Sequence, residues 1–367
     1  MKALHFYIIF SFILLNSVDA QSFLRGKVLS ETTGQPLSGA SIYFNNTSIG
    51  TLSNSNGEFN IPDAVAGELI ISSVGYERLI YPVKKEQLGV KTFTFKLQEK
   101  ENIMQDILIL PDATRKKYLK LFRDNFLGIT EEADRSRITN MGAIYFIRSP
   151  NDKNGIIALS DTPLNIINNQ LGYKVEFDLV QFYLNENTGR TSFYGFTRYN
   201  EMGDRRRFRK NRRNAYYGST VHFFRSLVSN RLQEESYNIY IIKEDSLKQK
   251  SNSISAGNNK MDIAFPAKAT DIITRDSVSG LFSANWGPKL MVQYLKKPGN
   301  RNYLTGKGLL VGVFGNGFRA YLHAENYPVK IDANGLLEDP MNVFYSGYWI
   351  YEKAASLLPY NYYPDND

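Results

Sequence analysis

The chain has 367 residues, no cysteine and a formal net charge of +8 at pH 7. The absence of cysteine excludes disulfides, thiol nucleophiles, cysteine-ligated zinc and a cysteine lipid anchor. Tyr and Phe are abundant, with 24 and 23 residues, and aromatic residues favour strands. We therefore expect a mainly β protein that folds without covalent cross-links.

Residues 1–20 have the features of a secretory signal peptide. Lys2 provides a positive start, Leu4 to Leu15 is almost wholly apolar, and Ala20 is a small residue at the cleavage position. A membrane-spanning helix needs about 20 apolar residues, so this run is too short, and no later stretch is long and apolar enough. We predict an exported protein without a transmembrane span in its mature chain, located in the periplasm, at the outer membrane or outside the cell.

Residues 21–98 predict a β-sandwich of seven short strands. Apolar and polar residues alternate in short runs, and turn residues such as Gly34, Pro36 and Gly57 separate them. The predicted strands are 24–29, 40–45, 50–52, 58–61, 69–73, 78–83 and 92–97.

Several motifs in this region occur in a recognisable order and spacing. They include Thr33-Gly34-Gln35-Pro36, Asn56-Gly57-Glu58-Phe59 and Ser72-Ser73-Val74-Gly75-Tyr76. In this order they resemble the carboxypeptidase regulatory-like domain. The resemblance implies a transthyretin-like β-sandwich that supports or docks a neighbouring domain and has no catalytic residues of its own.

Residues 99–112 are predicted to be a linker, and residues 113–367 an α+β domain with an antiparallel sheet and a few helices. Apolar residues at helical spacing predict a helix over 114–126. A Ser/Asn/Lys-rich stretch, 246–260, is predicted to be a mobile loop. Strands are predicted over 144–148, 156–160, 164–167, 173–184, 190–199, 237–243, 289–295, 309–314, 318–322 and 343–345.

The tract from Asn211 to Leu227 carries a second resemblance. It is similar to a tract in a class of exported envelope proteins in which the regulatory-like sandwich comes first. This resemblance implies the order of the domains and brings no activity with it.

The strongest charge feature lies just before and within this tract. Seven of the nine residues from Arg205 to Arg213 are basic. Such a run indicates either a binding site for an envelope polyanion, such as a glycan or a lipid headgroup, or a solvated start of a helix. Export argues against nucleic acid as the partner. The candidate binding residues are Arg205, Arg206, Arg207, Arg209, Lys210, Arg212, Arg213, Tyr216, His222 and Arg225.

A second interpretation of this segment is catalytic. The segment is helical in pattern, and Arg212, Ala215, Ser219, His222 and Ser226 recur at spacings of three and four, so they share one stripe and Ser219 and His222 could meet. A serine hydrolase also needs a carboxylate and an oxyanion hole, and no Gly-x-Ser-x-Gly sequence surrounds Ser219. A histidine beside an apolar face is more often a packing residue.

The sequence predicts no metal site and no cofactor. His222 and His323 are the histidines after the leader, and His323 with Glu325 offers two possible metal ligands but no third at recognisable spacing. The tyrosines near the C-terminus indicate either a platform for sugars or core packing.

We therefore expect a non-enzymatic exported envelope protein, in which the sandwich supports or docks a second domain that binds an anionic glycan, a lipid or a protein. The alternative is a hydrolase with a site around Ser219 and His222.

Overall fold

The computed structural model describes residues 22–100, 108–244, 262–296, 313–314 and 317–364. The predicted signal peptide and the predicted loop 246–260 lie outside the described residues. The chain divides into two compact units. The first takes in Met1–Phe44 and Ile49–Glu101, and the second takes in Asn45–Ser48 and Asn102–Asp367.

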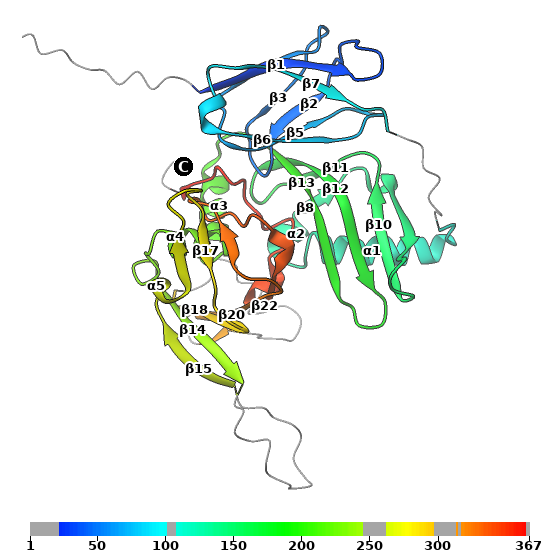
Figure 1. Cartoon of the computed structure of the whole chain (residues 1–367). Coiled ribbons are helices and arrows are strands. Elements are labelled where there is room, and N and C mark those ends of the chain that lie inside the picture. The colour runs from blue at the N-terminus through cyan, green and yellow to red at the C-terminus, as the bar shows by residue number, and fades with distance from the viewer. Residues whose placement is uncertain (1–21, 101–107, 245–261, 297–312, 315–316, 365–367) are drawn as a thin grey trace, which may run out of the picture. The chain divides into compact units, whose positions relative to one another are not determined.

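The first unit is the predicted β-sandwich, with two sheets in two layers (Figure 1). One sheet has the order β4 (Glu58–Pro62), β1 (Phe23–Ser30), β7 (Thr92–Leu97), and the other has the order β3 (Gly50–Leu52), β2 (Ser41–Phe44), β5 (Gly67–Ser72), β6 (Leu79–Val83). Strand β1 pairs antiparallel with β4 and parallel with β7. A short 3-10 helix, η1 (Lys85–Gln87), precedes β7. Every predicted strand of the sandwich is present, with ends that differ by no more than two residues.

Alternation along β1 shows how the sequence specifies the core of this unit. Leu24, Gly26 and Val28 are buried between the sheets, and the residues between them point away from the core. Gly26 is required by close packing, since a Cβ there would lie 2.9 Å from the ring of Phe59 and 2.4 Å from the carbonyl oxygen of Phe93. A larger side chain would therefore push the aromatic core apart.

The second unit begins with α1 (Asp112–Phe126), which packs on a curved antiparallel sheet. The sheet contains β8 (Ser136–Ile138), β9 (Ile144–Arg148), β10 (Gly155–Ser160), β11 (Leu164–Asn168), β12 (Tyr173–Asn185) and β13 (Thr191–Glu201), and the short helices α2 (Glu131–Asp134) and η2 (Met141–Ala143) flank β8. The ring of Phe122 lies 4.8 Å from that of Phe182, and the ring of Phe126 lies 4.9 Å from that of Phe177. These contacts bury the apolar face that predicted the helix.

A second antiparallel sheet follows in the same unit. Its order is β15 (Asp262–Ala267), β14 (Tyr237–Glu244), β18 (Lys289–Tyr294), β20 (Gly317–Ala324), β19 (Val313–Phe314), and β22 (Val343–Gly347) also pairs with β20. A smaller sheet contains β16 (Ile273–Arg275), β17 (Phe282–Ala284) and β21 (Val329–Ile331), and the short helices are α5 (Ala269–Ile272), η4 (Pro340–Asn342) and η5 (Tyr348–Tyr351). Strands β8, β15, β16, β17 and β21 were not predicted from the sequence.

The segment expected to be one helix is two helices, α3 (Arg206–Tyr216) and α4 (Thr220–Val228). Gly218 has φ +88°, a conformation that ends a helix and favours glycine. Ser219 is extended and caps α4. The prediction of one continuous stripe was therefore wrong, because helical spacing cannot be counted across this break.

Candidate functional site

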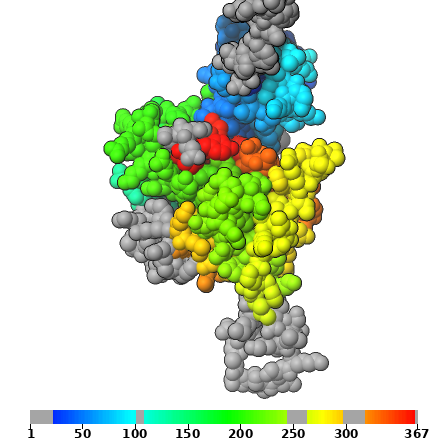
Figure 2. Space-filling view, turned by 90° about the vertical axis from the view of Figure 1, so that its left-hand side faces the viewer, coloured from blue at the N-terminus to red at the C-terminus, as the bar shows by residue number. Residues whose placement is uncertain are grey.

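The basic run lies at the start of α3, and most of its side chains reach solvent. The exposed residues, which we call the basic face, are Arg205, Arg206, Arg207, Lys210 and Arg213. Arg209 is half-buried and forms an ion pair with Asp204. The green to yellow-green part of the chain, which contains α3 and α4, reaches the surface in the space-filling view (Figure 2).

The opposite side of α3 is anchored to the loop between β11 and β12. Phe208 is 1% exposed and packs on Gly172, where a Cβ would lie 2.4 Å from the ring. The side-chain amide of Asn211 donates a hydrogen bond to the carbonyl of Gln170 at 2.8 Å. These contacts set the rotation of α3 about its axis and thereby direct the basic face outward.

Arg212 belongs to the anchored side, although it lies within the basic run. Its guanidinium donates to the carbonyl of Leu171 at 2.9 Å and lies 3.2 Å from the carboxylate of Glu201. It also lies 4.1 Å from the ring centroid of Tyr173. Arg212 is 2% exposed, and its partners Leu171, Glu201 and Tyr173 all belong to the second unit.

Arg225, on α4, is also buried and holds the C-terminal segment. Its guanidinium donates to the carbonyl oxygens of Asn334, Tyr362 and Tyr360 at 3.1, 2.8 and 2.5 Å. The ring of Tyr363 lies 4.0 Å from the guanidinium carbon. Arg225 therefore connects three backbone carbonyls that are more than 100 residues away in sequence.

His222 is buried among aromatic rings, and its two ring nitrogens have different partners. Nδ1 lies 3.1 Å from the backbone nitrogen of Gly218, which donates to it, and 3.0 Å from the hydroxyl of Tyr237. Nε2 lies 3.1 Å from the carboxylate of Glu235. Since Nδ1 accepts from a backbone N–H, we assign the proton to Nε2. Burial lowers the pKa of His222 to about 4, and Glu235 opposes this shift only in part.

Tyr216, the aromatic candidate, belongs to the same buried group. Its ring lies 5.0 Å from the ring of His222 and 5.6 Å from the guanidinium carbon of Arg225. It is 8% exposed. The structure thus brings Tyr216, His222 and Arg225 together in the interior, while the basic face points outward from α3.

Ser219 and His222 are neighbours, and their contact is one of helix capping. The hydroxyl oxygen of Ser219 accepts a hydrogen bond from the backbone N–H of His222 at 3.1 Å. The imidazole nitrogens are hydrogen-bonded to other groups, as described above. This geometry fits a capped helix with a packed histidine, which was the simpler of the two interpretations.

Sequence analysis missed a titratable group beside this cap, Glu352. Its carboxylate accepts hydrogen bonds from the backbone N–H and the hydroxyl of Thr220, at 3.1 and 2.8 Å. Burial raises the pKa of Glu352 to about 7, and the bonds from Thr220 oppose that shift. The adjoining cavity has a volume of about 20 Å³, too little for an organic ligand. In the sequence, the feature that could have marked Glu352 is that it is a single carboxylate in an aromatic segment.

The described residues contain no group of three His, Cys, Asp or Glu side chains placed to hold a metal ion. Among the helices of the described chain, none is long and apolar enough to cross a membrane. Three of the C-terminal aromatic residues contribute to packing, since Tyr348, Trp349 and Tyr362 are less than 7% exposed.

Comparison with known families identifies the first unit. Residues 24–109 match the CarboxypepD_reg-like domain. The match confirms the resemblance inferred from the turn motifs and includes all seven strands of the sandwich except the first residue of β1, Phe23. No curated protein matches the chain.

Among solved structures, the chain has a weak similarity to the crystal structure of a 9R-lipoxygenase from Cyanothece PCC8801. The identity is 11% and the TM-score is 0.16. The similarity covers 57% of this chain and spans 48% of the lipoxygenase chain. A likeness this low assigns neither fold nor activity, so the CarboxypepD_reg-like domain is the assignment that the comparisons support.

Proposed function

We propose that this is an exported, non-enzymatic protein of the cell envelope that binds a polyanionic surface through the basic face of α3. The CarboxypepD_reg-like domain serves as its support or docking module. The observation that carries the proposal is the division of α3 into an anchored side and five exposed cations. The partner chemistry is phosphate or carboxylate groups carried close together, as on lipid headgroups or an acidic envelope glycan.

Electrostatics supports this function in two ways. The cations come from one helical segment, so the spacing of their backbone positions is fixed before a ligand arrives, and only their side chains have to be ordered on binding. The first turn of α3 also contains no acidic residue. Positive charges there oppose the helix dipole by about 0.3–1 kcal/mol each, and a bound anion would interact favourably with both the charges and the helix N-terminus.

The test compares the leaderless protein with a variant in which Arg206, Arg207, Lys210 and Arg213 are all replaced by Gln. Binding is measured to vesicles of anionic phospholipid, to vesicles of zwitterionic phospholipid, and to a soluble acidic glycan, each at low and high salt. We expect binding to an anionic ligand that weakens as salt rises. For an anionic membrane, each removed cation should cost about 1 kcal/mol of binding free energy.

A matched control removes four exposed lysines elsewhere, by replacing Lys85, Lys116, Lys117 and Lys174 with Gln. Net charge then changes equally in both variants, and only the first loses the basic face. Vesicle binding alone would identify lipid headgroups as the source of the anion, and glycan binding alone would identify a polysaccharide. Binding that ignores salt, or equal losses in the two variants, would contradict the proposal.

A further inference from the structure

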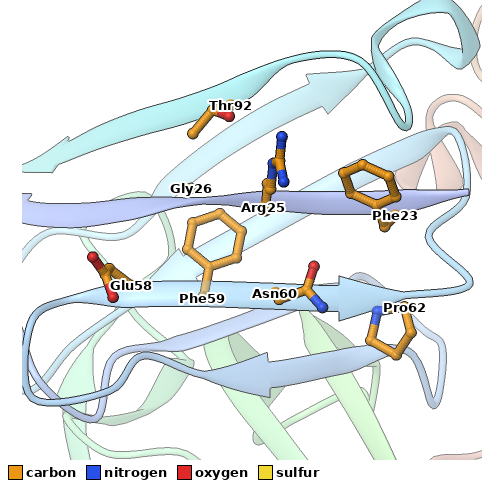
Figure 3. A pocket seen from close by; sticks show the side chains of 8 residues that line it. All are labelled: Phe23, Arg25, Gly26, Glu58, Phe59, Asn60, Pro62 and Thr92. Atoms are coloured by element: carbon orange, nitrogen blue, oxygen red, sulfur yellow. The ribbon is translucent and has the colours of Figure 1, made fainter.

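A second candidate site lies in the first unit, on the outer face of the sheet formed by β4, β1 and β7. An open groove of about 550 Å³ is present there. Figure 3 shows that its side chains come from these three neighbouring strands. The outward-facing side chains that line it are Phe23, Arg25, Glu58, Asn60, Pro62 and Thr92.

The strand register arranges these side chains in rows. Arg25 is opposite Asn60 on one side and opposite Thr92 on the other, so the three polar groups form one row across the sheet. Phe23 is opposite Pro62 in the next row. Neighbouring strands are about 4.8 Å apart and alternate residues of one strand about 6.8 Å apart. The groove therefore offers an apolar row beside a polar row on a rigid surface.

The chemistry of the lining is mixed and close to electrically neutral. Phe23 and Pro62 supply apolar contact, and the guanidinium carbon of Arg25 lies 5.2 Å from the centre of the Phe23 ring. The polar groups are a guanidinium, a carboxamide, a carboxylate and a hydroxyl, which together include several donors and several acceptors. Arg25 and Glu58 are the charged residues of the lining and have opposite signs, and Lys27, outside the lining, is opposite Glu58 in the strand register. This composition contrasts with the basic face, which carries cations alone.

A ligand that complements this lining has a small apolar face, a rim of hydroxyl groups and no net charge. A pyranose ring has these properties, because its C–H face can pack on an aromatic ring while its hydroxyls both donate and accept hydrogen bonds. A polyanion would meet one carboxylate for the one guanidinium of the lining, and an apolar peptide would leave the polar row without partners. We propose that this groove binds a neutral carbohydrate chain.

The rigidity of the surface favours the same occupant. The side chains project from three hydrogen-bonded strands, and the buried residues beneath them, Gly26 and Phe59, are packed in the core. Binding would therefore need little ordering of the protein. An open groove with few contacts gives modest affinity per site, as suits a module that attaches to a repetitive polymer.

The experiment uses the leaderless full chain, labelled and applied to an array of neutral glycans. The glycans bound most strongly are then titrated by calorimetry in low and high salt. We expect at least one neutral oligosaccharide to bind, with an affinity that changes little with salt. Replacing Phe23 by Ala should weaken binding roughly tenfold, the upper range for an aromatic contact.

Two further variants keep the outcome interpretable. Asn60→Ala changes an exposed polar residue of the groove and should also weaken binding, whereas Asn56→Ala, outside the groove in the same domain, should leave it unchanged. Thermal unfolding of each variant checks that the domain is folded. The absence of any bound neutral glycan, or binding that Phe23→Ala and Asn60→Ala both leave intact, would overturn the proposal.

The groove proposal can be tested independently of the proposed function. The variant that lacks four cations of the basic face should bind the neutral glycan as the unmodified protein does. If that variant loses glycan binding as well, the carbohydrate contact belongs to α3 and the groove proposal is wrong.

Discussion

The sandwich and the α3–α4 region bury different kinds of side chain. The core of the sandwich consists of aliphatic and aromatic residues, and its charged residues point to solvent. In the α3–α4 region, Arg212, His222 and Arg225 are all less than 10% exposed, and each forms a hydrogen bond with a backbone group. In the sandwich, residue type therefore indicates whether a side chain is buried. In the α3–α4 region, burial of a polar side chain depends on which hydrogen-bonding partners the fold provides.

The difference also separates structural from binding roles among residues of the same type. Arg206 and Arg212 lie in the same basic run, yet the first is exposed and the second is buried against Tyr173. A buried guanidinium satisfied by carbonyls is costly to remove, whereas an exposed one contributes little to stability. Changes in the free energy of unfolding on substitution test this contrast.

The largest effect is expected for Arg225→Ala. The change removes three charge-assisted hydrogen bonds and leaves the carbonyls that accepted them without that donor, so we expect the free energy of unfolding to fall by about 4 kcal/mol. Chemical denaturation measures it. Arg206→Ala is the control, since this arginine is exposed and should be worth less than about 1 kcal/mol. Equal losses would remove the distinction between buried and exposed arginines.

The next effect is a pH dependence with two opposing parts. Glu352 has a raised pKa in the folded state, about 7, so its contribution favours folding at low pH and is lost as pH rises from about 4.5 to 7. His222 has a lowered folded pKa, about 4, so the folded state binds fewer protons than the unfolded state and stability rises between pH 4 and 6.5. In the unmodified protein these slopes largely cancel.

Glu352→Gln should expose the His222 slope. Relative to the unmodified protein, the variant should gain about 3 kcal/mol of unfolding free energy on going from pH 4.5 to 7. Denaturation curves at both pH values provide the measurement. His222→Gln is expected to show the opposite slope, and identical pH profiles for all three proteins would contradict the assigned protonation states.

A smaller loss is expected for Gly218→Ala, which tests the break between the helices. Alanine would adopt φ +88° with strain, and its Cβ would lie 3.0 Å from the ring of Phe318. We expect a loss of about 2 kcal/mol by thermal or chemical unfolding. Gly142→Ala is the matched control, because Gly142 has open space around it. A stable Gly218→Ala protein would favour a continuous helix.

The smallest effect is expected for Ser219→Ala, which removes the cap of α4. The expected loss is about 1 kcal/mol, and Ser219→Thr, which keeps a hydroxyl at the cap, should recover most of it. Treatment with a serine-hydrolase activity probe tests the alternative function in the same samples. Labelling of the unmodified protein that disappears in Ser219→Ala would favour the hydrolase over the capping role.

The sandwich could be predicted almost strand by strand because its signals are local. Alternation of apolar residues marks each strand, and residues such as Gly57 mark turns by backbone conformation alone. The antiparallel character of the second unit and helix α1 followed from the same kind of pattern. The short strands β16, β17 and β21 have three residues each, too few to show a period.

The amino-acid sequence by itself determined the sandwich, the basic run and the candidate residues of α3 and α4, because these depend on patterns of near neighbours. Tertiary structure alone decided which arginines are buried and that Glu352 lies beside Thr220, whereas the helix break has a local signal, Gly218 followed by the capping Ser219. The physical reason is that burial of a charge depends on partners supplied from distant parts of the chain. Arg225 and the carbonyl of Tyr362 are 137 residues apart, and no local pattern records that hydrogen bond.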